Sequence, residues 1–177
     1  MKRISIVILA ACGLALSSSG CFFKPQPPRG VMSYRHGKVF LHKDDYYTVA
    51  ELPDGWSRMH TRARTISFYN EGLRSSISTD AICDRTQVNR TLSSLAGEVG
   101  SALENRTVVR EEEFMLDGRG ALRRHYEGKL DGVPTAVDLV VVRKDPCVFD
   151  FYLVAPKGTD DTARADFETF FGAFHYE

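Results

Sequence analysis

The sequence predicts an α+β fold in which helices cover an antiparallel sheet, and two observations support this. Apolar residues alternate with a period of two over most of the chain, but with a period near four around residues 92–103 and 160–171. Short turn sequences separate the period-two segments, and they leave no room for the crossover connections of a parallel sheet. We therefore expect one domain with an antiparallel sheet and two helices packed on it.

The first half of the domain is predicted to contain four strands, over residues 45–52, 56–64, 65–69 and 73–82. The first is rich in Tyr, Thr and Val and stops at the turn sequence Pro-Asp-Gly at 53–55. The last two form a predicted hairpin around Asn-Glu-Gly at 70–72. Trp56, directly after the first turn, is expected to be a core residue.

The first helix is predicted from the change of period after these strands. One helical face carries Leu92, Leu95, Ala96, Val99 and Leu103. Residues 86–89 precede this face and are expected to cap the helix.

The second half is predicted to be a four-stranded antiparallel meander followed by a helix. The strands span residues 107–116, 121–130, 135–143 and 148–154, separated by Asp-Gly at 117–118, Asp-Gly at 131–132 and Asp-Pro at 145–146. Asp-Gly between alternating strands is a strong hairpin signal. The closing helix, residues 160–171 or slightly beyond, is expected to pack its apolar stripe on the sheet, namely Ala163, Phe167, Phe170, Phe171 and Phe174.

The order of these elements resembles that of the PsbP-like and DcrB-like group. The likeness covers roughly residues 45–176 and rests on Tyr-Tyr-Thr-Val at 46–49, Leu-Pro-Asp-Gly-Trp at 52–56, the two Asp-Gly hairpins and the aromatic terminal helix. It implies an α/β/α sandwich, often exported or lipid-anchored, that acts as a binding or assembly factor. It carries over no catalytic residues.

The first 20 residues are predicted to be a signal peptide. Lys2 and Arg3 precede an apolar run from Ile4 to Leu16, and small residues follow at 17–20. The run is shorter than the roughly 20 apolar residues that a membrane-spanning helix needs. Cleavage is therefore expected.

The next residue, Cys21, stands in a sequence that resembles the lipobox of bacterial lipoproteins. Ser18 occupies the position where Leu is usual in that family, with Ser19 and Gly20 as the small residues. The resemblance implies that Cys21 receives lipid, including acyl chains such as palmitate, and becomes the mature N-terminus. The alternative at Cys12 would leave too short an apolar segment. Ordinary cleavage near Gly20, which would give a soluble secreted protein, remains the other interpretation.

Residues 21–33 are predicted to form the lipidated Cys and a proline-rich tether, and residues 34–177 the globular domain. This organisation places the domain at a bacterial membrane, inner or outer, facing the periplasm or the cell exterior. In such an oxidising compartment the two remaining cysteines, Cys83 and Cys147, are expected to form a disulfide. Two separately buried thiols are the alternative.

No chemical motif in the sequence indicates a metal, a cofactor or a catalytic centre. The five histidines lack the spacing of zinc sites, and the nucleotide-loop and nucleophile-elbow sequences are missing. Without the signal peptide the chain has two more acidic than basic residues, which argues against a nucleic-acid partner. A dispersed active site would escape such motifs.

Two charged segments allow a functional and a structural interpretation. The first is a basic stripe of side chains that would share one face of a strand, namely Arg58, His60, Arg62 and Arg64. This stripe could bind an anionic envelope molecule. A solvated strand face is the interpretation we favour. The glutamates at 111–113 could form a cation site, but we favour a solvated surface on which they pair with arginines of 119–124 across a hairpin.

Two functions are compatible with these sequence features. The first is a membrane-anchored, non-catalytic domain that binds an envelope protein or an anionic envelope molecule. The second is a lipid-anchored hydrolytic enzyme with residues gathered from separate loops.

Overall fold

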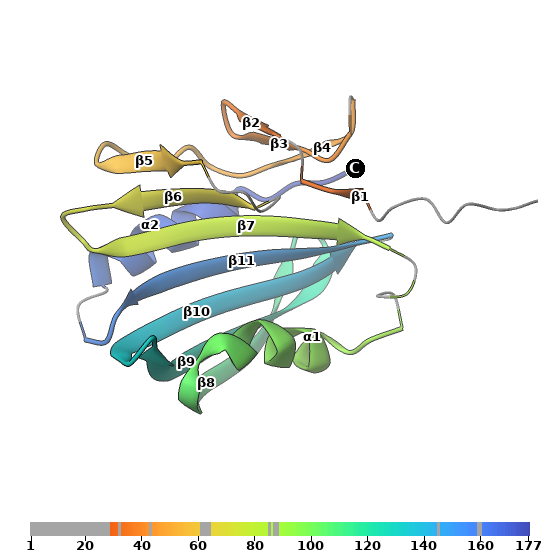
Figure 1. The fold of residues 1–177 in the computed structure, drawn as a ribbon. Coiled ribbons are helices and arrows are strands. Elements are labelled where there is room, and N and C mark those ends of the chain that lie inside the picture. Colours follow the sequence, from red (N-terminus) through yellow and green to blue (C-terminus); the bar gives the residue numbers. More distant parts are fainter. Residues whose placement is uncertain are drawn as a thin grey trace, which may run out of the picture.

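A single large antiparallel sheet forms the centre of the protein, with one helix on each face (Figure 1). The computed structural model describes residues 29–31, 33–42, 44–60, 65–84, 86, 89–144, 146–158 and 161–177. The predicted signal peptide and Cys21 lie outside these residues. The α+β fold predicted from the sequence is confirmed.

The main sheet runs in the order β5-β6-β7-β11-β10-β9-β8, with β1 paired to β7. Its strands are β1 (Arg29–Gly30), β5 (Trp56–Met59), β6 (Ile66–Asn70), β7 (Ser75–Cys83), β8 (Glu104–Leu116), β9 (Arg119–Leu130), β10 (Val133–Lys144) and β11 (Cys147–Pro156). All pairs are antiparallel. The predicted hairpin β6–β7 and the meander β8–β11 are therefore confirmed.

Two Asp-Gly turns determine the register of the meander. In both turns the Asp and the Gly have positive φ: 49° and 72° at Asp117 and Gly118, and 50° and 79° at Asp131 and Gly132. This is the backbone of the type I′ turn, whose twist matches that of the strands it joins.

Side chains of β10 alternate between two separate cores. Val140 and Val142 face the core that contains α2 (Asp161–Gly172), whereas Leu139 and Val141 face the core under α1 (Leu92–Val99). Because both faces of this strand are covered, it is apolar almost throughout. The predicted stripe of the C-terminal helix lies in the first core, with Phe167 and Phe170 fully buried.

The helix α1 begins and ends differently from the prediction. Its N-cap is Thr91, whose hydroxyl accepts a hydrogen bond from the Ser94 N–H at 3.1 Å, and not a residue of 86–89. The α-helix ends at Val99 and continues as a short 3₁₀ turn, η2 (Gly100–Ala102). At Gly100 an added Cβ would lie 2.7 Å from the Tyr126 ring, so this close approach needs a residue without a side chain.

A small second sheet near the N-terminus was not predicted as such. It consists of β2 (Ser33–Arg35), β3 (Lys38–Phe40) and β4 (Tyr46–Thr48), and β4 is shorter than the strand expected over 45–52. It packs on the α2 side of the main sheet through the fully buried Tyr47, whose hydroxyl lies 2.8 Å from that of Thr79. The strand β1 begins at Arg29 and Val31 is buried, so part of the range predicted for the tether packs with the domain.

Cys83 and Cys147 form the disulfide expected from the sequence, across a sequence separation of 64 residues. The two residues lie at the ends of adjacent strands, one position beyond the Ile82–Val148 pair. The bond therefore closes the edge of the β7–β11 ladder.

Asp117 holds the C-terminal segment against the main sheet. Its carboxylate accepts hydrogen bonds from Lys144 Nζ (2.6 Å) and the Tyr176 N–H (3.1 Å), and it lies 2.9 Å from Nδ1 of His175. Burial alone would raise the pKa of Asp117, but these three partners outweigh it and lower the pKa to about 2.

Asp117→Asn is expected to lower the free energy of unfolding by about 1–2 kcal/mol at pH 7. The folded-state pKa is below the ordinary 3.8, so the carboxylate stabilises the fold fully above about pH 5 and loses this effect as pH falls through 2. Urea unfolding at pH 7 and pH 2 measures the difference. Asp131→Asn, at the equivalent turn position, is the control. An equal loss of unfolding free energy in Asp117→Asn at both pH values would show that the ionised carboxylate is not what stabilises the fold.

Candidate functional site

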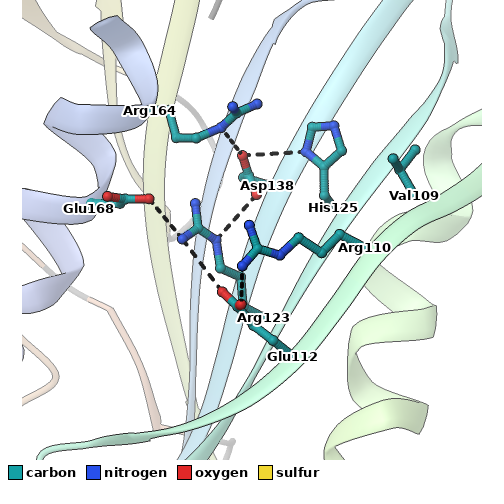
Figure 2. A pocket seen from close by; sticks show the side chains of 8 residues that line it. All are labelled: Val109, Arg110, Glu112, Arg123, His125, Asp138, Arg164 and Glu168. Carbon is teal, nitrogen blue, oxygen red and sulfur yellow. Dashed lines mark hydrogen bonds and ion pairs between the residues drawn. The ribbon is translucent and has the colours of Figure 1, made fainter. Parts of the chain in front are cut away.

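A cavity of about 270 Å³ lies between the edge of the sheet and α2, and charged side chains line it (Figure 2). The lining residues are Val109, Arg110, Glu112, Arg123, His125, Asp138, Arg164 and Glu168. They come from β8, β9, β10 and α2, so the site exists only in the folded protein.

Asp138 is the centre of this cluster, with only 4% of its side chain exposed. Its carboxylate accepts a hydrogen bond from Arg164 Nε at 3.0 Å and a longer one from Arg123 Nε at 3.4 Å. Nδ1 of His125 lies 3.4 Å from the same carboxylate. Figure 2 shows the side chains of Arg123, Arg164 and His125 converging on Asp138 from different sides.

Strand periodicity and register bring these residues together. Arg123 and His125 are two positions apart on β9, so they share a face of the sheet. His125 is the direct partner of Asp138 on β10. Arg164 and Glu168 are four apart on α2 and therefore lie on one side of the helix.

The outer part of the cluster is an ion-pair network at the cavity rim. Arg123 Nη1 donates to Glu168 Oε1 at 2.8 Å and lies 3.8 Å from Glu112 Oε1. Glu112 in turn accepts from Arg110 at 2.5 Å. Arg110 is 71% exposed and Glu168 51% exposed, so solvent or a partner can reach this rim.

The electrostatics of the cavity make Asp138 a poor general base. Burial alone would raise the pKa of Asp138, but the hydrogen bond from His125, the charge of Arg123 and the hydrogen bond from Arg164 outweigh it and lower the pKa. A carboxylate held in this way is a weak base at neutral pH. The described lining residues bring a histidine and carboxylates together, as the hydrolase hypothesis requires, but include no Ser, Thr or Cys to act as nucleophile.

Two of the three glutamates at 111–113 pair with arginines across the β8–β9 hairpin as predicted, whereas Glu113 lies opposite Leu122. Glu111 is the strand partner of Arg124 and Glu112 that of Arg123, and both pairs form salt bridges. Glu111 and Arg124 lie on the α1 face. There Arg124 also donates to the Ser93 carbonyl (3.2 Å) and hydroxyl (2.8 Å), which attaches α1 to the sheet.

The structure describes only two of the four residues of the predicted basic stripe. Arg58 lies over the rings of Tyr34 (5.5 Å) and Phe68 (6.0 Å), and His60 is exposed. Arg62 and Arg64 lie outside the described residues. Trp56 is half-buried against the core, and its indole N–H donates to Asp166 at 2.8 Å.

Sequence reasoning missed Asp138, Arg164 and Glu168. The signal for Asp138 was its place as the one charged residue in the apolar run from Thr135 to Val142. A buried charge needs a partner, so such a residue indicates that oppositely charged side chains lie next to it in the folded protein. Nothing local in the sequence identifies the residues of α2 as its partners.

Within the described ranges, no group of three or more His, Cys, Asp or Glu side chains is arranged to hold a metal ion. No helix in the same ranges is long and apolar enough to cross a membrane.

Several solved structures share the fold, although no protein-family model and no curated protein sequence matches the chain. Cyanobacterial PsbP from Synechocystis is 16% identical with a TM-score of 0.52, over 96% of this chain and 99% of that one. LpqN of Mycobacterium tuberculosis, described as involved in cell envelope biogenesis, is 12% identical with a TM-score of 0.51, over 75% and 84%. A variant of the protein Mog1 is 12% identical with a TM-score of 0.51, over 85% and 96%. Identities this low establish likeness of fold alone, and the fold is the PsbP-like one that the sequence resembles.

Proposed function

We propose that this protein is an envelope lipoprotein, anchored through Cys21, whose domain binds a partner without catalysing a reaction. The charge-paired cavity of Figure 2 carries the binding part of the proposal. Its central carboxylate is neutralised by fixed cations, and its rim is accessible. Such an arrangement recognises a surface by its charge pattern and shape, whereas the lowered pKa of Asp138 makes this carboxylate a poor general base.

The surroundings of the cavity favour an envelope protein as the partner over an anionic envelope molecule. Val108 and Val109, on the edge strand β8, are 48% and 55% exposed, and Val109 lines the cavity. Apolar side chains next to a polar rim are typical of protein interfaces. An anionic molecule would instead meet the acidic groups Glu112 and Glu168 at the same rim.

The location of the domain outside the cytoplasm rests on two supports. The signal-peptide pattern and the lipobox-like sequence before Cys21 direct export and lipidation. The Cys83–Cys147 disulfide is of the kind that persists in oxidising compartments. The fold likeness to LpqN, described as involved in envelope biogenesis, agrees with this location.

Crosslinking in intact cells, followed by mass spectrometry of the captured proteins, tests the binding surface. Val109→Glu places a charge beside the cavity and is expected to abolish capture of the partner. Met115→Glu is the matched control, because Met115 is 69% exposed on the same strand but does not line the cavity. Equal capture by wild type and Val109→Glu would rule out the cavity as the interface.

The anchor has its own expected result. The mature N-terminal peptide should begin at Cys21 and carry added acyl mass, and Cys21→Ala should release the protein from the membrane fraction. Mass spectrometry of the purified protein and fractionation of cells measure both. An unmodified Cys21, or a mature chain that begins at another residue, would exclude lipid anchoring.

A further inference from the structure

A second cavity of about 240 Å³ lies on the opposite face of the sheet, beside α1. Asp80 of β7, Asp150 of β11 and Glu98 of α1 supply its acidic groups, and Arg90 lies before the helix. Leu95 and Val99 form part of its apolar wall. The function proposed above does not involve this cavity.

The two aspartates are direct cross-strand partners. Asp150 pairs with Asp80 in the antiparallel β7–β11 ladder, so both side chains project from the same face. Cβ atoms of such partners are about 4.5–5.5 Å apart, a distance at which two like charges destabilise the sheet. An acidic pair at this position therefore needs either a compensating positive charge or a bound proton.

The described residues do not provide that charge. Asp80 Oδ1 accepts the Ala81 N–H at 2.7 Å. Oδ1 of Asp150 is fully buried and has no hydrogen-bond partner within the described part of the chain. Arg90 lies 2.6 Å from a carboxylate oxygen of Glu98 and is engaged there.

Protonation is the response of the protein when no cation is present. Burial, and then the charges of Asp80 and Glu98, raise the pKa of Asp150 to about 7. Burial also raises the pKa of Asp80, although the Ala81 N–H opposes it. The hydroxyl of nearby Tyr152 stays neutral, because burial raises its pKa as well.

We propose that this cavity binds one organic cation, an alkylammonium group, whose charge lies between Asp80 and Asp150 and whose apolar stem lies against Leu95 and Val99. An ammonium group has three hydrogen-bond donors, and it could donate to these carboxylates. It also needs fewer ligands than a metal ion, for which the described residues offer no group of three.

The proton and the ammonium compete for the same carboxylates, which gives the site a defined pH dependence. Binding requires ionised Asp150, so affinity rises with pH and levels off above about 7. Below that pH, binding releases up to one proton per site. The opposite trend would be expected of a site that binds an anion.

Calorimetry with cadaverine, on the mature chain purified in non-ionic detergent, tests the proposal. We expect saturable binding at pH 8, an affinity on the order of tenfold weaker at pH 6, and none with the uncharged pentanediol. Runs at pH 6 in buffers of different ionisation enthalpy should reveal the released proton. Absence of saturable binding at pH 8, or equal binding of the diol, would overturn the proposal.

Two variants and a control complete the test. Asp150→Asn should abolish cadaverine binding, and it should fold because it removes an uncompensated buried charge. Asp80→Asn should weaken binding. Glu71→Gln, an exposed acidic residue in the β6–β7 turn, should leave affinity unchanged. Wild-type affinity in Asp150→Asn would disprove the site, whereas the partner-capture experiment on Val109 would be unaffected.

Discussion

Replacing both Cys83 and Cys147 with Ser is expected to lower the free energy of unfolding by about 4 kcal/mol. The bond closes a loop of 64 residues, and in the chain-entropy model this restricts the unfolded chain strongly. It also joins the ends of β7 and β11, the two central strands that connect the N-terminal strands to the meander. Because a single domain has only about 5–15 kcal/mol of stability, this loss would be a large fraction of the total.

Guanidinium unfolding, followed by fluorescence of Trp56, measures the effect of the disulfide. Trp56 is the only tryptophan of the chain and is half-buried against the core, so its emission reports the folded state. The double Ser variant should unfold at the same denaturant concentration as wild type treated with reductant. If both thiols of native, non-reduced protein react with a thiol reagent, the cysteines are not paired in the cell.

Asp138→Ala is expected to destabilise the domain by about 3 kcal/mol or more. The substitution removes the shared anion from between Arg123, Arg164 and His125. Arg123 is only 15% exposed and keeps only the rim carboxylates of Glu112 and Glu168 as partners. Removing one member of a buried ion cluster costs far more than removing an exposed pair, because the remaining charges stay desolvated.

The control for Asp138 is Glu112→Gln, at the rim of the same cavity. Glu112 is 34% exposed, so this substitution is expected to lower the free energy of unfolding by less than about 1 kcal/mol. The pKa of Asp138 is lowered in the fold, so the difference between Asp138→Ala and wild type should shrink as pH falls below about 4. Urea unfolding at pH 7 and pH 3 measures both effects. Equal losses in the two variants at pH 7 would show that Asp138 is not the centre of the cluster.

The part of the fold next to tight turns could be predicted in detail. The Asp117-Gly118 turn pairs Leu116 with Arg119, and counting back from it pairs Glu111 with Arg124. The predicted salt bridges across this hairpin followed from that register. Further along, irregularities in β8 near Val108 shift the pairing, and no sequence signal locates them.

Other elements could not be predicted because their causes are distant in sequence. The strands of the small sheet are only three residues long, too short to show a period. They owe their position to contacts such as that of Tyr47 with Phe149 and Phe174. The close approach at Gly100, just after α1 ends, is to the ring of Tyr126, which comes from the distant strand β9.

The sequence by itself determined the α+β class, the meander and the helix that carries the aromatic stripe. It also led us to expect the pairing of Cys83 with Cys147. These features follow from local periodicity, from turn chemistry and from the small number of cysteines. Only the tertiary structure decided which charged residues meet. Asp138 meets Arg164 because α2 returns to the sheet, and Asp80 meets Asp150 because β11 pairs with β7 after a helix and three intervening strands. Such contacts depend on packing between elements far apart in the chain, which a local pattern does not encode.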